Sequence, residues 1–145
     1  MKEFREFIDN GIITKISQNK SRAKALFEES ERKNKTLKLI MEKIGLTDDN
    51  ANDIVEHGYD IIMNVLRAKL YLDGFKAYGE GAHEAEVSYL KELGFSDTDT
   101  DFLNNLRYYR NGIKYYGKRF EQSYADDVLD FLERIIPKLN KVYLD

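Results

Sequence analysis

The chain has 145 residues, of which 42% are hydrophobic and 34% are charged, and its formal net charge is −3. This length suits one domain, and the absence of cysteine excludes disulfides, thiolate nucleophiles and cysteine-rich zinc sites. The negative balance argues against a non-specific coat on nucleic acid, so such binding would need a local basic surface. No apolar run approaches the ~20 residues that cross a bilayer, and the N-terminus lacks the apolar core of a signal peptide. We therefore expect a cytoplasmic protein without a membrane contact.

Helical periodicity dominates the first third of the chain. A short helix is expected from Glu3 to Asn10, ended by Gly11. Apolar or small residues between 12 and 44 then follow one face of a long helix. Gly45 is typical of a C-terminal cap, and Thr47 or Asp48 is the expected N-cap of the next helix.

The second long helix, over residues 54–75, is expected to be the most buried. Alternating steps of four and three connect Ile54, Gly58, Ile61, Val65, Ala68, Leu72 and Phe75. A second apolar row, Ile62, Leu66 and Leu70, widens the stripe. The pattern predicts either a central position in a bundle or a helix that serves both a core and a dimer contact.

Glycines and cap-type residues divide the rest of the chain. Residues 79–81 break it, a shorter helix follows over 82–93, and Gly94 ends that helix. The run from Ser96 to Asp101 is a strong N-terminal signal for a helix that ends near Tyr116 or Gly117. A final helix is expected over 123–142. The whole chain, 1–145, is therefore predicted to be a single all-α domain, an antiparallel four- to five-helix up-down bundle.

The segment from Leu106 to Arg119 combines positive charge with tyrosine. It holds five basic residues and four tyrosines, and neither Asp nor Glu occurs between Phe102 and Phe120. On a helix, one side of it is expected to face the core: Phe102, Leu106, Tyr109, Ile113 and Tyr116. Another side forms a basic and amide stripe made of Arg107, Arg110, Asn111, Lys114 and Lys118, with Tyr108 and Tyr115 at its margins. A phosphate-bearing partner would favour such a surface.

The alternative for this stripe is a solvated helix face paired with acids of a neighbouring element. Two details favour function. The stripe has a single sign, whereas stabilising surface faces usually mix charges. Gly112 lies inside the expected helix at a cost of about 1 kcal/mol relative to Ala, which suggests close approach by another backbone or a ligand.

The order of these features resembles the HEPN superfamily (higher eukaryote and prokaryote nucleotide-binding domains). The resemblance covers about residues 49–139 and includes the long second helix, the glycine break before His83 and the run from Arg110 to Gly117; residues 1–45 would be N-terminal helices. It implies a helical bundle, usually a homodimer, with the motif residues of both subunits at a shared cleft. Active members are metal-independent RNA endonucleases, and others pair with nucleotidyltransferases as toxin–antitoxin systems or serve as degenerate binding domains.

Within that resemblance, Arg110 takes the role of the phosphate-binding arginine and Asn111 that of the polar residue after it. The family's motif histidine is absent, because positions 115, 116 and 117 are Tyr, Tyr and Gly. With an ordinary pKa near ~10, Tyr115 is a poor general base at neutral pH. Tyr115 and His83 are therefore only candidate substitutes, and no metal or cofactor is expected.

The two histidines, His57 and His83, are further candidates for a metal ligand and a general base. Asp53, Glu56, His57 and Asp60 share a helix face, but one histidine with carboxylates is a weak metal pattern and indicates a solvated face. His83 begins the third main helix after the glycine break, where a helix N-terminus would lower its pKa and favour the neutral form. The alternative is a surface histidine paired with Glu84 or Glu86.

The sequence thus favours an RNA- or nucleotide-phosphate-binding module whose Arg107, Arg110, Lys114 and Lys118 hold phosphate without efficient cleavage, and which docks to a partner such as a nucleotidyltransferase. The enzymatic alternative is a metal-independent ribonuclease that uses Arg110. A third, structural reading makes the stripe a dimer contact to acids such as Asp97, Asp99 and Asp101.

Overall fold

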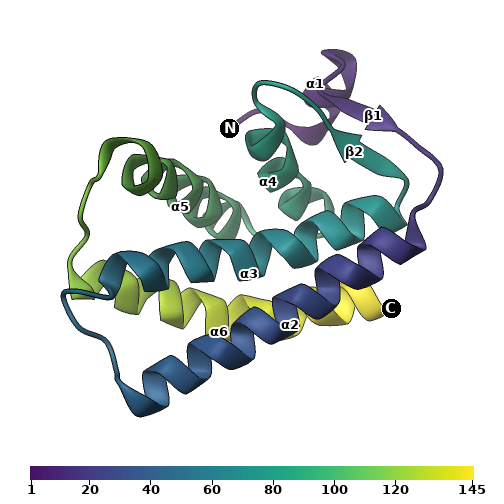
Figure 1. The fold of residues 1–145 in the computed structure, drawn as a ribbon. Helices are drawn as coiled ribbons and strands as arrows, with labels where there is room; N and C mark the ends of the chain where they lie inside the picture. The colour runs from purple at the N-terminus through teal and green to yellow at the C-terminus, as the bar shows by residue number, and fades with distance from the viewer.

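The computed structural model describes all residues, 1–145, as six helices and one two-stranded antiparallel ribbon (Figure 1). In chain order the elements are α1 (Phe4–Asp9), β1 (Ile13–Lys15), α2 (Lys20–Lys43), α3 (Ala51–Leu72), β2 (Phe75–Ala77), α4 (Ala82–Glu92), α5 (Asp97–Tyr116) and α6 (Gln122–Leu144). The expected all-α bundle is confirmed, although it has six helices where four or five were expected. None of the helices combines the length and apolar character needed to span a bilayer.

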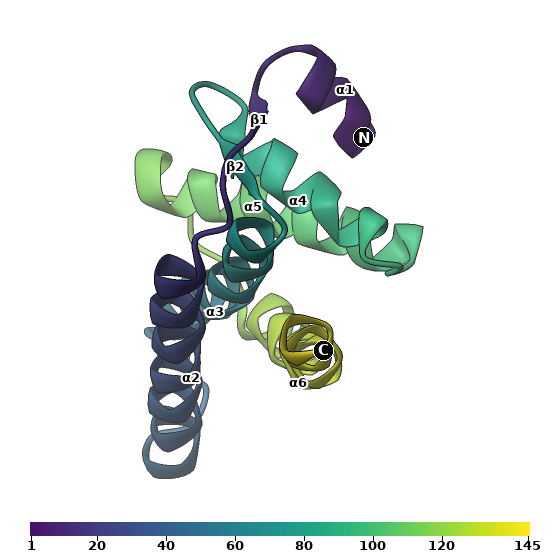
Figure 2. The ribbon, with the colours of Figure 1, turned by 90° about the vertical axis from the view of Figure 1, so that its right-hand side faces the viewer.

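Helix α3 is the centre of the molecule, as its two apolar rows predict. It contacts α2, α4, α5 and α6, and thirteen of its 22 residues are buried. Viewed nearly along its axis, α2 and α6 lie below it while α4 and α5 cover its other side (Figure 2). A helix covered on both sides can present polar side chains only where its neighbours leave a gap, and this restricts where a site can form.

The direction of α6 differs from a simple up-down order. Helices α2 and α3 form an antiparallel pair, but α6 runs in the same direction as α3 (Figure 1). Two shorter helices, α4 and α5, together make the return path that one long helix would make in a four-helix bundle. Because of this division, α5 crosses the top of the bundle and one of its ends is left largely free.

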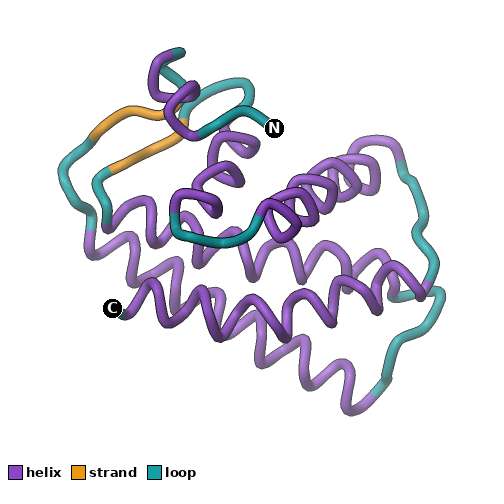
Figure 3. Tube along the Cα trace, turned by 180° about the vertical axis from the view of Figure 1, so that it is seen from behind, coloured by secondary structure: helices purple, strands orange, loops and turns teal.

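The β ribbon was not predicted. Its register pairs Ile13 with Ala77 and Lys15 with Phe75, so the helix expected over 12–44 begins only at Lys20 and the helix expected to reach Phe75 ends at Leu72 (Figure 3). The apolar spacing at both ends is compatible with helix as well as strand. Pairing between segments some sixty residues apart decides the outcome, and a single segment's periodicity does not contain that information.

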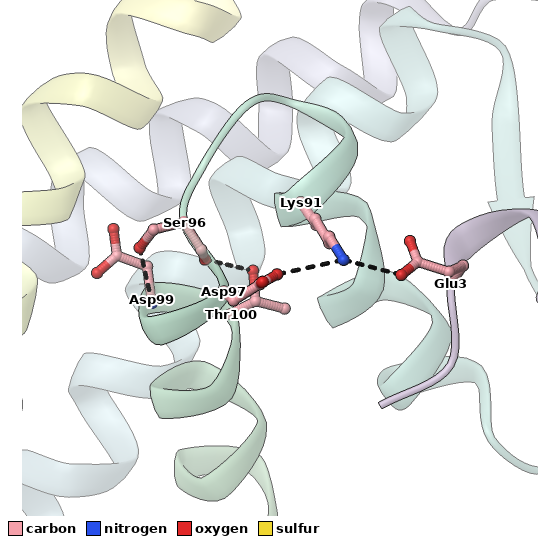
Figure 4. A network of polar contacts seen from close by, with 6 residues as sticks. All are labelled: Glu3, Lys91, Ser96, Asp97, Asp99 and Thr100. Atoms are coloured by element: carbon pink, nitrogen blue, oxygen red, sulfur yellow. Dashed lines mark hydrogen bonds and ion pairs between the residues drawn. The ribbon is translucent and has the colours of Figure 1, made fainter.

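Side-chain caps and ion pairs join the shorter elements. Ser96 caps α5, because its Oγ accepts a hydrogen bond from the Asp99 amide at 3.1 Å (Figure 4). Lys91 of α4 lies between Glu3, at 2.8 Å, and Asp97, at 3.2 Å. These contacts fix α1 and the start of α5 against α4. The expectation that Thr47 or Asp48 is the N-cap of α3 is wrong, because α3 begins at Ala51 and its N-cap is Asn50. The Thr47 hydroxyl instead accepts a hydrogen bond from the Asn50 amide at 3.1 Å, in the turn before the helix.

Candidate functional site

Two basic residues of α5 lie next to polar groups of α3. The Arg110 side chain is only 17% exposed, and its guanidinium carbon lies 5.4 Å from the centre of the buried Tyr59 ring. The nearest carboxylate oxygen, Oδ1 of Asp60, is 4.0 Å away, which is too long for a hydrogen bond. The Arg107 Nε donates to Asn104 at 3.1 Å. Arg110 is thus held between helices without a close anionic partner.

The Nε atom of Arg110 is buried and has no hydrogen-bond partner. A buried donor without a partner is uncommon in folded proteins and costs free energy, about 1–3 kcal/mol for a neutral group and more for a charged one. An anionic ligand that reached this guanidinium would remove part of that cost. Arg110 is therefore not part of a satisfied structural ion pair.

His83, from the first turn of α4, completes the site from the other side of Tyr59. Its Nδ1 atom lies 3.3 Å from Nη2 of Arg67 and 3.4 Å from the Tyr59 hydroxyl. Arg67 also donates from Nε to Glu86 at 3.0 Å, an ion pair that is mostly buried. Tyr59 therefore contacts both His83, through its hydroxyl, and Arg110, through its ring face.

These contacts define the state of the His83 ring. A guanidinium can only donate, so Nδ1 must accept and the proton of the neutral ring resides on Nε2. Burial lowers the pKa of His83 below its ordinary value, and the charges of Arg67, Arg110, Arg107 and Lys114 lower it further. The direction is the one expected from the sequence, but the causes are burial and neighbouring cations. At neutral pH the neutral ring therefore carries its N–H donor at Nε2.

Four cations lie close enough to His83 to lower its pKa. We call Arg67, Arg107, Arg110 and Lys114 the cationic cluster. Its acids are Glu86, which Arg67 holds, and Asp60, near Arg110. Burial raises the pKa of Glu86 in spite of Arg67, and burial raises the pKa of Tyr59 to about 12, so the phenol stays protonated. The cluster thus keeps an excess of positive charge together with neutral donors.

Two residues of the predicted stripe lie elsewhere. Lys118 follows the end of α5 and folds back, so that a Cβ atom added to Gly112 would be 3.3 Å from its Cδ. The close approach expected at Gly112 is therefore made by the chain's own Lys118. Asn111 lines a pocket together with Tyr115 and Tyr116. Helical spacing placed Lys118 in the stripe, but Gly117, with a φ of +63°, ends the helix before it.

The expected core face of α5 is only partly correct. Leu106 is buried and Phe102, Tyr109 and Ile113 are partly buried, but Tyr116 is 81% exposed. The last turn of α5 extends past its supporting helices, so a core position by periodicity has no core to face. Tyr115 is also exposed, at 65%. The structure therefore brings His83 to Arg110 but leaves Tyr115 outside the site.

The sequence did not suggest Tyr59 or Arg67, and it named Asp60 only beside His57. Glu86 was named as a possible partner of His83, but it pairs with Arg67 instead. A signal for Arg67 does exist, since it is a charged residue within an apolar stretch of a central helix, where charges are rarely placed without a partner. The acids proposed for a dimer contact are largely engaged within the chain: Asp97 binds Lys91, and Asp99 binds Arg134 at 2.8 Å.

The side chains around His57 do not form a metal-binding site. The structure brings together no three His, Asp, Glu or Cys side chains that could hold a metal ion. The donors around His83 are cationic or neutral and suit an anion instead. No protein-family model, curated protein or solved structure matches the chain.

Proposed function

We propose that this protein is an RNA- or nucleotide-phosphate-binding module of HEPN-like type, with the cationic cluster as its phosphate site. The observation that carries the proposal is Arg110, a mostly buried guanidinium whose Nε lacks a partner and whose nearest carboxylate oxygen is 4.0 Å away. Guanidinium groups bind phosphate through paired N–H donors, and Arg67, Arg107 and Lys114 add charge at the same place.

Binding without cleavage is favoured by the orientation of His83. A general base needs a free lone pair, but the Nδ1 lone pair points toward Arg67 and Tyr59. The Nε2–H is a donor, suited to a phosphate oxygen. Proton abstraction from a ribose hydroxyl would require the ring to leave these contacts, so we assign His83 to binding.

The test is the affinity for a fluorescent RNA oligonucleotide at low salt. We expect Arg110→Ala with Lys114→Ala to weaken binding at least about tenfold, since charge-assisted phosphate contacts contribute roughly 1.5–3 kcal/mol each. The matched control is Arg32→Ala with Lys35→Ala, which removes the same two residue types from the exposed surface of α2. Equal affinities of wild type and the Arg110/Lys114 variant would refute the proposal.

The second candidate is a metal-independent ribonuclease, favoured by the neutral His83 beside Arg67. The same preparations incubated with RNA in EDTA distinguish the two. Cleavage by wild type that is lost in Arg110→Ala and in His83→Gln would identify the enzyme. Binding without cleavage identifies the module. Homodimer formation and docking to a nucleotidyltransferase belong to the same proposal and derive from the sequence resemblance.

A further inference from the structure

Exposed tyrosines cover the side of α5 next to the cationic cluster. Tyr108 and Tyr115 are each 65% exposed, and Tyr116 is 81% exposed. Of the large hydrophobic side chains that reach solvent, no other three come from one helix. A group of exposed aromatic side chains is a mark of an interaction surface.

These tyrosines border a groove between the end of α5 and residues 117–120. The groove has a volume of about 680 Å³, within the range of small-ligand sites. Tyr108, Tyr115, Tyr116 and Phe120 supply its aromatic surfaces, and Lys118 and Arg119 supply its charge. We call it the tyrosine groove.

Contacts with α3, α5 and α6 fix residues 118–120, which form one wall of the groove. Asn52 of α3 donates from Nδ2 to the Lys118 carbonyl at 2.8 Å and accepts from the Phe120 amide at 2.9 Å. The Phe120 ring lies 5.2 Å from both Tyr109 and Tyr124. Because the returning segment is fixed in this way, little ordering is needed when a ligand enters.

The chemistry of the groove points to one kind of occupant. Its lining residues include two cations and no acid, and flat aromatic faces lie beside them. Lys114 of the cationic cluster lies 5.4 Å from the Tyr115 ring centre, so the two surfaces meet at that residue. A partner with planar unsaturated rings on one side and regularly spaced negative charges on the other would fit both the tyrosine groove and the cationic cluster.

We propose that the tyrosine groove stacks unpaired bases of single-stranded RNA whose phosphates lie on the cationic cluster, and that it thereby selects single strands over duplex. The inference rests on the proposed function and extends it to the form of RNA. Tyr108 and Tyr115 are seven residues apart, about 10 Å along a helix, which leaves room for successive bases. A duplex keeps its base faces stacked inside and has none to offer.

The test compares three probes: a short single-stranded RNA, the same strand annealed to its complement, and inorganic polyphosphate. We expect Tyr108→Ala with Tyr115→Ala to weaken single-strand binding at least about fivefold for each tyrosine that stacks. Affinity for duplex and polyphosphate should stay unchanged. Tyr108→Phe with Tyr115→Phe should retain single-strand affinity, because the ring face is kept. Tyr78→Ala removes an exposed tyrosine outside α5 and serves as the control.

Each remaining outcome counts against one claim or both. If the tyrosine-to-alanine variant binds single strands as wild type does, while Arg110→Ala with Lys114→Ala weakens them, the groove assignment fails and the phosphate site stands. If wild type binds none of the probes, both fail. If the alanine variant changes only the oligomeric state, measured by light scattering, the tyrosines form a contact between copies and the inference is overturned.

Discussion

At the scale of single residues, the site depends on one phenol. The Tyr59 hydroxyl meets His83, its ring supports Arg110, and its pKa is raised to about 12, so it remains a neutral donor at any physiological pH. The neighbouring His83 imidazole is also neutral, because burial and nearby cations both disfavour its protonated form. Neutral donors thus lie between the cations, and of the two nearby acids Glu86 is held by Arg67 while Asp60 stays 4.0 Å from Arg110.

His83 is expected to titrate below its ordinary pKa of about 6.5. Because the folded-state pKa is lowered, the unfolded chain takes up this proton first, and the associated stability is lost as the pH falls through and below that ordinary value. Arg67→Met keeps much of the side-chain volume but removes the nearest charge, so the pKa should rise. An NMR titration of the imidazole signals measures both. A pKa at or above the ordinary value in wild type would contradict this account.

At the scale of elements, the packing of α3 on α6 is closest at one glycine. A Cβ atom at Gly58 would lie 2.6 Å from Cγ1 of Val128. Gly112, in contrast, faces only the flexible end of the Lys118 side chain at 3.3 Å. Glycine is therefore required at position 58, where a larger side chain would clash with Val128, but not at position 112.

Gly58→Ala should destabilise the fold by about 1–3 kcal/mol, because overpacking outweighs the gain of about 1 kcal/mol in helix propensity. Adding Val128→Ala should recover part of that loss. Gly112→Ala should be neutral or stabilising by up to about 1 kcal/mol, since Lys118 can move. Urea unfolding of the four proteins measures these differences. Equal destabilisation at both glycines would show that the contact with Val128 is not the cause.

At the scale of the whole molecule, charge is divided between surfaces. The net charge is −3, yet residues 102–120 contain no acid. An acidic protein repels polyanions in general and attracts them only where the local field is reversed, so binding should be confined to this one side and should depend on orientation.

Salt dependence tests that division. Four phosphate contacts, one for each member of the cationic cluster, predict a slope of about −3 for log affinity against log salt on single-stranded RNA. Arg110→Ala with Lys114→Ala should reduce the slope by about half, whereas the α2 control should leave it unchanged. A slope near zero in wild type would mean that contacts other than phosphates provide the affinity.

The sequence predicts the helices well and the site only in part. Cap residues such as Ser96 and the apolar rows of α3 are local signals, so element positions follow from them. The predicted end of α5 near Tyr116 or Gly117 is confirmed, but the β ribbon and the path of residues 118–120, which Asn52 holds, depend on partners distant in sequence. Arg110 can be recognised from the residues next to it in the sequence. Arg67 and Tyr59, in contrast, belong to the site only because helices α3, α4 and α5 meet there.

The long-range pairings between residues 13–30 and residues 61–77 share a simple rule. Ile13 with Ala77, Ile16 with Gly74, Asn19 with Tyr71 and Ser30 with Ile61 all have residue numbers that add to 90 or 91. Helices α2 and α3 and the ribbon therefore form one continuous hairpin that closes outward from the turn at Gly45, between α2 and α3. Each further pairing encloses only a few more residues, so the distant strands require little additional loop-closure entropy once the helices have met. Opening should proceed in the reverse order, with the ribbon separating before the helix pair.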